Sequence, residues 1–141
     1  MKSDSNLNQQ VKIATSVTGI GPIIAANMII TTNEFRDITE AKKFSCYSGV
    51  APFEHSSGTS IKRKSRVSHL ANKKMKSLLH LGARSAVLAS PELKLFYQRK
   101  IAEGKAPLSV LNAVCNKLIS RVFVCIKQQR LYEKNYQPNL A

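Results

Sequence analysis

Apolar residues recur at intervals of three or four along most of this 141-residue chain, which is the spacing of amphipathic helices rather than strands. Near the start, residues 6–14 are polar with a few apolar positions, and predict the end of a longer helix whose beginning is missing. Residues 15–21 are typical of a turn, and an almost wholly apolar run, 23–30, follows Pro22. A helix is expected from Pro22, because proline has no N–H that a first helical position would leave unpaired.

The next helix is expected to begin near Asp37, where Glu40 three residues later completes a capping box. It should end at Gly49, because glycine readily adopts the left-handed backbone of a C-cap. From residue 50 to about 71 the helical spacing disappears, and proline, glycine, serine and threonine predict an exposed loop or short hairpin.

Three helices are predicted in the second half of the chain. The first follows Asn72, and the second begins with Ser90 as N-cap and Pro91 as first residue and reaches Gly104. Pro107 begins the last and longest helix. Its apolar stripe belongs either to the core, which is favoured, or to a partner interface. The stripe consists of Leu108, Leu111, Cys115, Leu118, Val122 and Cys125 or Ile126.

These elements predict a mostly α fold. A helix-hairpin-helix element near residues 15–31 is followed by a basic loop and a small helical bundle. Residues 1–14 are interpreted as the end of a linker helix, residues 15–136 as one domain, and residues 137–141 as a disordered tail.

The charge balance indicates the class of partner. Twenty-two Lys and Arg residues against eight Asp and Glu give a net charge of +14, which favours a polyanion because each neutralised phosphate releases counterions. A lipid surface is disfavoured, since aromatic residues make up only 6 % of the chain and Trp is absent. No apolar stretch approaches the roughly 18–20 residues of a membrane span, and the start lacks the apolar run of a signal peptide. A cytoplasmic nucleic-acid-binding protein is therefore expected.

Cysteines and acidic residues offer no cofactor pattern. Cys46, Cys115 and Cys125 form no CxxC pair, and small buried thiols in a reducing compartment are favoured over metal ligands or a disulfide. The eight acidic residues are scattered, whereas two-metal phosphoryl transfer needs carboxylates that converge on the ions. We therefore expect no metal site and no other cofactor in this chain.

A glycine pair marks the predicted hairpin. Gly19 and Gly21 flank Ile20 immediately before Pro22, and Ala25 lies one turn into the following helix. Glycines allow the backbone to bring free N–H groups close to a phosphate at a helix N-terminus. This pattern is typical of a helix-hairpin-helix turn that binds DNA. Phosphate binding at Gly19 and Gly21 is favoured, with a purely structural tight turn as the alternative.

The span between Glu54 and Glu92 contains basic residues and no acidic one. Helical spacing places Lys73, Lys76, His80 and Arg84 on one face, opposite Met75, Leu79 and Ala86. A solvated face is the alternative, but bases without interleaved acids favour a nucleic-acid groove that contacts phosphate. The bases of this span are Lys62, Arg63, Lys64, Arg66, Lys73, Lys74, Lys76 and Arg84.

The same span begins with the sequence His55-Ser56-Ser57-Gly58. A serine hydroxyl that attacks phosphorus must be deprotonated or metal-activated, and surrounding cations stabilise the charge on the phosphate oxygens. Taken alone, a serine beside glycine in a basic loop is more often a turn former than a nucleophile. His55 is either a base for this serine or a bystander.

Three linked segments carry a family resemblance. Residues 16–22 hold the Gly-Ile-Gly-Pro turn, residues 44–52 run from Phe to Pro through Tyr-Ser-Gly, and Ser57-Gly58 is followed by Arg-Val-Ser at 66–68. In this order and spacing they resemble the C-terminal domain of the IS110/IS116/IS902 family of bacterial insertion-sequence transposases, from about residue 12 to residue 136.

The resemblance implies a function in DNA transposition and recombination. Family members combine an RNase-H-like N-terminal domain, whose Asp-Glu-Asp-Asp tetrad binds a divalent metal such as Mg²⁺, with a C-terminal domain that supplies a serine nucleophile for strand exchange. That serine corresponds to Ser57, with Ser56 as the adjacent alternative. DNA is the implied partner, together with a structured guide RNA in some members and a homo-oligomer in the full assembly.

The chain departs from the family pattern in three respects. Thr18 stands where the hairpin usually has Pro, and Ala71 stands where many members have Gly. Family members are also much longer, and nothing in this chain corresponds to the metal-binding tetrad. We therefore expect it to be inactive alone, as part of a split transposase, an internally started product or a decayed remnant. The alternative function is a non-catalytic nucleic-acid-binding module.

Overall fold

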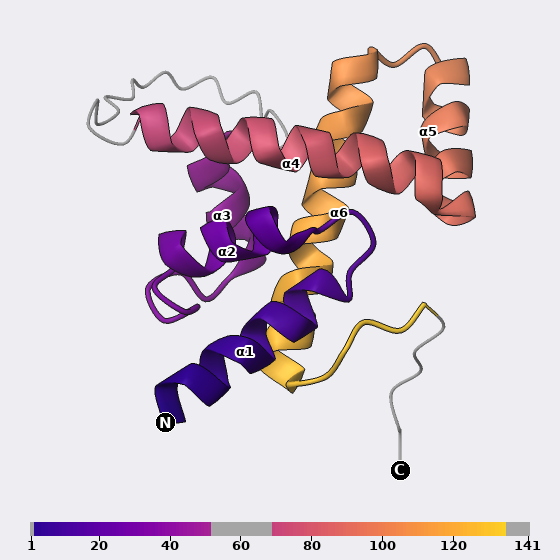
Figure 1. Cartoon of the computed structure of the whole chain (residues 1–141). Helices are drawn as coiled ribbons and strands as arrows, with labels where there is room; N and C mark the ends of the chain where they lie inside the picture. The colour runs from indigo at the N-terminus through magenta and orange to yellow at the C-terminus, as the bar shows by residue number, and fades with distance from the viewer. Residues whose placement is uncertain (1, 52–68, 135–141) are drawn as a thin grey trace.

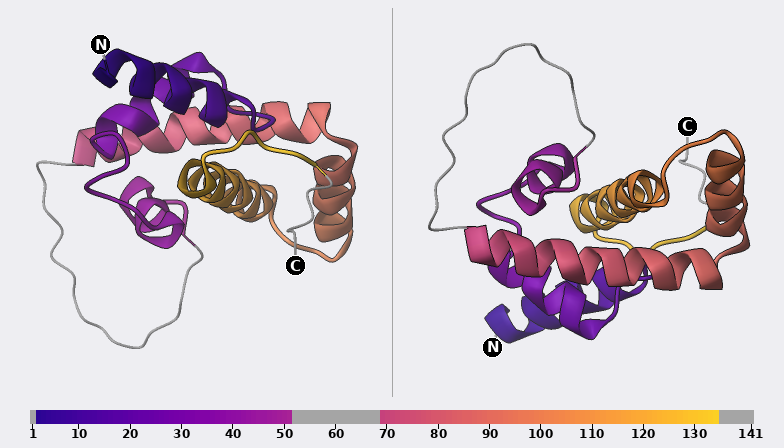
Figure 2. Two further views of the ribbon diagram at one scale, coloured as in Figure 1. Left: turned by 90° about the horizontal axis from the view of Figure 1, so that it is seen from below. Right: turned by 90° about the horizontal axis from the view of Figure 1, so that it is seen from above.

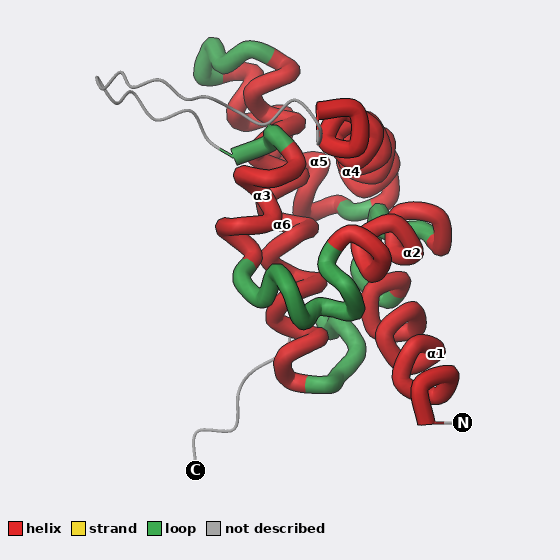
Figure 3. The backbone as a smooth tube through the Cα atoms, turned by 90° about the vertical axis from the view of Figure 1, so that its left-hand side faces the viewer, coloured by secondary structure: helices red, strands yellow, loops and turns green. Residues whose placement is uncertain are grey.

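The computed structural model describes residues 2–51 and 69–134, with side chains described for residues 5–51 and 73–134. Within these ranges the regular secondary structure is helical and the remaining residues form loops and turns (Figures 1 and 3). This confirms the predicted mostly α fold. The helices are α1 (Lys2–Thr15), α2 (Pro22–Thr31), α3 (Ala41–Ser48), α4 (His69–Ala89), α5 (Pro91–Ala102) and α6 (Pro107–Gln128).

Helix α4 forms the middle of the molecule. It contacts α2 on one side and α3 and α6 on the other, while α5 turns back from its C-terminal end and packs on α6 (Figure 2). Helix α1 packs against α2 and α6, so it contributes Ile13 and Ala14, both fully buried, to the same core as the later helices. One continuous core therefore joins the two described parts of the chain.

Helix α6 supplies the largest share of this core. The predicted apolar stripe is buried from Leu111 to Ile126, which confirms its assignment to the core, but Leu108 is 61 % exposed. The stripe fails at Leu108, although Val110 in the same first turn of α6 is only 2 % exposed, because Leu108 borders an open concavity beside α4. Among the described residues α6 is also the one helix long and apolar enough to cross a membrane, and most of its apolar window is buried inside the fold.

Local signals fix most of the helix ends. Helices α2, α5 and α6 begin at Pro22, Pro91 and Pro107 as predicted, and the Ser90 hydroxyl accepts a hydrogen bond of 3.3 Å from the Leu93 N–H. Gly49 ends α3 in the left-handed conformation, with φ of 76°. The predicted boundaries are therefore confirmed at these positions.

The predicted start of α3 near Asp37 is wrong. The helix begins at Ala41, and Glu40 is its N-cap residue without a side-chain cap. Asp37 instead belongs to a turn, where its N–H donates to the Thr32 carbonyl (3.0 Å) and its carboxylate accepts from the Asn33 amide (3.4 Å). A capping box at Asp37 is excluded because the residue already closes this turn.

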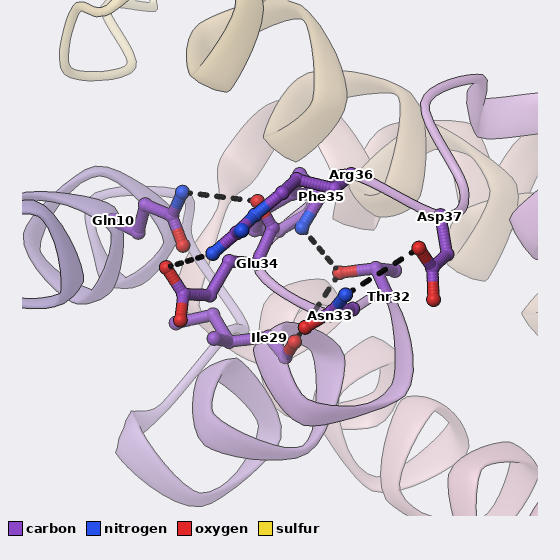
Figure 4. A network of polar contacts seen from close by, with 8 residues as sticks. All are labelled: Gln10, Ile29, Thr32, Asn33, Glu34, Phe35, Arg36 and Asp37. Carbon is purple, nitrogen blue, oxygen red and sulfur yellow. Dashed lines mark hydrogen bonds and ion pairs between the residues drawn. The ribbon is translucent and has the colours of Figure 1, made fainter. Parts of the chain in front are cut away.

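The turn between α2 and α3 has an unusual backbone. Asn33, Glu34 and Phe35 all have positive φ angles, of 54°, 60° and 63°, a conformation that costs roughly 1–2 kcal/mol for each residue with a side chain. Contacts from Gln10 (Figure 4) and from Phe123 offset this cost. The Gln10 amide donates to the Glu34 carbonyl (3.2 Å), and the Phe35 ring meets the Phe123 ring edge to face, with centroids 5.2 Å apart.

Candidate nucleic-acid interface

The glycine turn between α1 and α2 lies directly against α4. Gly19 has a φ of +98°, and a Cβ atom at this position would lie 2.7 Å from both the Ala86 Cβ and the Gly82 carbonyl oxygen. A Cβ at Gly82 would lie 2.5 Å from the Gly19 carbonyl oxygen. The two backbones therefore approach so closely that each position accepts only glycine. The positive φ and the close packing together account for Gly19, and the contact at Gly82 was not predicted.

Gly21 lies in a different environment within the same turn. A Cβ at Gly21 would meet no atom within 4 Å, and its φ of −88° is open to any residue. Gly21 is the N-cap of α2, has no side-chain capping hydrogen bond, and lies two residues before Ile23, which is 68 % exposed. The start of α2 is thus open to solvent. Phosphate binding at Gly19 and Gly21 stays a prediction.

The C-terminal segment holds this turn from a second side. The Tyr132 N–H donates to the Ser16 hydroxyl (2.8 Å), which links the chain after α6 to the end of α1. The Arg121 guanidinium lies 5.1 Å from the centre of the Tyr132 ring and forms an ion pair with Glu92 of α5 (3.1 Å). Two separate segments therefore fix the position of the glycine turn.

The predicted basic face of α4 is present. Lys73, Lys76 and Arg84 are exposed and His80 is half-buried, while Met75, Leu79 and Ala86 on the opposite side are buried. The ion pairs found in the described parts of the chain involve Glu34, Glu92 and Glu103, and none includes a base of this face. The face therefore keeps its positive charge available for an anionic partner.

A groove adjoins this face where α3, α4 and α6 meet. It has a volume of about 970 Å³, and its lining includes Lys76, Asn112 and Asn116. The Asn112 side-chain oxygen lies 2.8 Å from His80 Nε2, so it holds the imidazole against α6. The Asn116 amide donates to the Val50 carbonyl (2.6 Å) and fixes the chain after α3.

The two asparagines were missed by sequence reasoning. They lie one helical turn apart on α6, beside its predicted apolar stripe, and together with Ser109 they form a polar row at intervals of three and four. The spacing of this polar row could be predicted from the sequence. The closeness of the row to α4 could not be predicted, because it depends on how α6 crosses α4.

The predicted site residues fall into three groups. Lys73, Lys76 and Arg84 share one face of α4, and Gly19 and Gly21 lie near the opposite face, where Gly82 and Ala86 are. The structure thus brings the three bases together but separates them from the glycine turn. The third group lies outside the described residues and consists of Ser56, Ser57, Lys62, Arg63, Lys64 and Arg66. Ala51, the last described residue before that segment, lines the groove.

The cysteines differ in their surroundings. Burial raises the pKa of the Cys115 thiol to about 12, and it also raises the pKa of Cys125. These two thiols are inert parts of the core, as predicted. Cys46 is exposed, which corrects the expectation of a buried thiol, because it lies on the side of α3 that borders the groove.

A metal site is not provided by the described residues. Over residues 5–51 and 73–134, no three His, Cys, Asp or Glu side chains come together to hold an ion. The described residues therefore include no group that would hold the divalent metal, which the family resemblance assigns to an RNase-H-like domain.

Comparison with known proteins identifies the family. The model of the IS116/IS110/IS902 transposase family matches residues 11–98, which include the glycine turn and the whole of α4. The chain belongs to this transposase family. The match covers the turn, the basic face and the segment with Ser57, so it confirms the resemblance that the linked motifs carry.

Several relatives of this transposase-family chain are longer proteins. The pilin gene-inverting protein of Moraxella bovis is 26 % identical over 132 residues, which are 91 % of this chain and 40 % of that protein. A 43.6 kDa protein of insertion element IS110 from Streptomyces coelicolor is 29 % identical over 121 residues, which are 86 % of this chain and 30 % of the relative. The chain thus spans less than half the length of these relatives.

Proposed function

We propose that this chain is the DNA-binding portion of a transposase or recombinase that catalyses DNA strand exchange. The observation that carries the proposal is the basic face of α4, which has no ion-pair partner among the described acids and lies beside an open groove. Because the chain belongs to the transposase family, DNA is the polyanionic partner that we propose. The name of the Moraxella bovis relative, a pilin gene-inverting protein, supports recombination as the reaction class.

We assign the nucleophile to Ser57, with Ser56 as the adjacent alternative. In this scheme the serine hydroxyl attacks a DNA phosphorus, loses its proton to a base, and forms a phosphoserine ester. The bond to one DNA end breaks, and its oxygen takes up a proton to leave as a hydroxyl. The phosphate thereby stays esterified, now to the serine, and can be transferred to a new strand. The support for Ser57 is the family motif rather than any contact.

Other components would complete the assembly. A divalent metal such as Mg²⁺ would stabilise charge on the phosphate oxygens, and we assign it to an RNase-H-like domain outside this chain. A structured guide RNA and a homo-oligomer belong to the same proposal, on the basis of the family resemblance. The bases on α4 would hold the DNA backbone in place while the reaction proceeds.

Charge removal on α4 tests the DNA-binding face. We expect the double variant Lys76→Gln/Arg84→Gln to bind duplex DNA more weakly and to reduce the slope of log affinity against log salt by about two, because each phosphate contact contributes about one. Fluorescence anisotropy titrations at several salt concentrations measure this slope. Lys127→Gln, an exposed lysine at the far end of α6, is the matched control and should change it little. Because the control removes one charge rather than two, a control slope that falls by about one would mean generic attraction of DNA to a basic chain.

Gly21→Ala tests the glycine turn separately. Because the position has an ordinary φ and open space, we expect the variant to fold with a free energy of unfolding within about 0.5 kcal/mol of the wild type. If the α2 N-terminus binds phosphate, the added methyl group should keep the phosphate from the backbone N–H groups and lower DNA affinity about fivefold. Unchanged affinity in a normally folded variant would leave the turn with a structural role only.

A further inference from the structure

We propose that a hollow between α4 and the start of α6 binds an unpaired nucleobase of a single-stranded DNA or RNA segment. This inference rests on the proposed nucleic-acid-binding function and names a site within it. The hollow has a volume of about 490 Å³ and is lined by Lys76, Ser77, His80, Leu81, Arg84 and Leu108. It lies on the side of the basic face that borders α6.

Two exposed leucines line this hollow. Leu81 of α4 is 59 % exposed, and Leu108 of α6 is 61 % exposed. A single exposed leucine is common on protein surfaces and needs no explanation. Here two leucines from different helices line one concavity, so together they offer two sides of an apolar site.

The charges around the hollow identify its occupant. Lys76 and Arg84 lie among the same lining residues as the two leucines, and no described acid forms an ion pair with either base. An apolar partner alone would leave these cations unmatched, and a DNA backbone alone would leave the leucines in contact with charged phosphates. A nucleobase flanked by its phosphates satisfies both, because apolar side chains bind its faces and cations bind its backbone.

The hollow continues into the larger groove. Lys76 and Leu108 line both, and the groove extends from them along α6 to Asn112 and Asn116. His80 is held in place by its contact with the Asn112 side-chain oxygen (2.8 Å). A strand of several nucleotides therefore has a continuous path, with one base placed between the leucines and the next nucleotides beside polar amides.

Leucine truncation tests this site with three probes. The probes are a fluorescein-labelled 12-nucleotide strand of thymidines, the same strand with abasic sites, and a 12-base-pair duplex. We expect Leu81→Ala and Leu108→Ala each to weaken binding of the thymidine strand about fivefold, near the lower end of base-stacking contributions. Binding of the abasic strand and the duplex should stay within about twofold, since neither offers an unpaired base.

Two further variants keep the test independent of folding. Leu88→Ala removes an even more exposed leucine (80 %) from the same helix but outside the hollow, and should bind every probe as the wild type does. Leu81→Phe offers a larger flat surface and should bind the thymidine strand more tightly than the wild type.

The outcomes separate this site from the proposed function. If the wild type binds no probe, the nucleic-acid-binding function fails and the nucleobase site fails with it. If the wild type binds but the leucine variants match it, or lose equal affinity for all three probes, only the nucleobase site is overturned. The site is also overturned if the wild type self-associates in sedimentation experiments and Leu81→Ala or Leu108→Ala makes it monomeric, because the hollow would then join two copies of the chain.

Discussion

Replacement of Ser57 by alanine is expected to abolish strand exchange when the chain is assembled with an RNase-H-like metal-binding domain. Alanine has no hydroxyl to form the phosphoserine ester, and removal of a covalent nucleophile lowers rates by about 10³-fold or more. DNA binding should persist, because the bases of α4 remain in place. The measurement is strand exchange on labelled DNA, together with detection of a protein–DNA adduct that survives denaturation.

Neighbouring serines provide the controls for this experiment. Ser60→Ala removes a hydroxyl from the same segment and should keep both exchange and adduct. Loss of the adduct in Ser56→Ala, with Ser57→Ala active, would move the nucleophile by one residue. Exchange by Ser57→Ala at the wild-type rate, with Ser56→Ala also active, would contradict a serine mechanism. A wild-type assembly that binds DNA but forms no adduct would instead be a non-catalytic nucleic-acid-binding module.

Helix boundaries were predictable wherever a local signal decides them. Pro22, Pro91 and Pro107 each begin a helix because proline fits the first turn whatever surrounds it. Gly49 ends α3 for an equally local reason, since a left-handed backbone is accessible to glycine without cost. Such signals act within a few residues and need no knowledge of the fold.

The chain between α2 and α3 was not predictable in the same way. Three successive residues take left-handed conformations there, although none of them is glycine. Their cost is offset by Gln10 of α1 and Phe123 of α6, which lie far away in the sequence. The capping-box pattern at Asp37 was misleading because these tertiary contacts form a turn that uses Asp37 first.

The candidate interface also combines features that local sequence predicts with features that depend on how the helices pack. Periodicity placed Lys73, Lys76 and Arg84 on one face of a helix, and this is confirmed. The groove beside them depends on the crossing of α4, α3 and α6, which no local pattern encodes. Leu108 is predicted in the core because its spacing continues the apolar stripe, yet it lines the open hollow between α4 and α6 and is 61 % exposed.

Gly19→Ala is expected to lower the free energy of unfolding by about 3 kcal/mol or more. Two independent costs add at this position. A side chain at φ of +98° strains the backbone by roughly 1–2 kcal/mol. The new Cβ would also lie 2.7 Å from the Ala86 Cβ and the Gly82 carbonyl oxygen, so the turn must move away from α4, at roughly 1–3 kcal/mol.

Two variants separate these costs when unfolding by denaturant is followed by circular dichroism. Gly82→Ala has only the steric cost, because its Cβ would lie 2.5 Å from the Gly19 carbonyl oxygen. Its backbone is that of an ordinary helix, so there is no strain from a positive φ. We expect it to lose less than Gly19→Ala, because alanine favours the helix by about 1 kcal/mol. Gly21→Ala has neither cost. Equal stability of Gly19→Ala and Gly21→Ala would contradict the close approach of the turn to α4. If Gly19→Ala is destabilised as expected, only one of the two glycines in the turn, Gly21, can be substituted to test DNA binding without disturbing the fold.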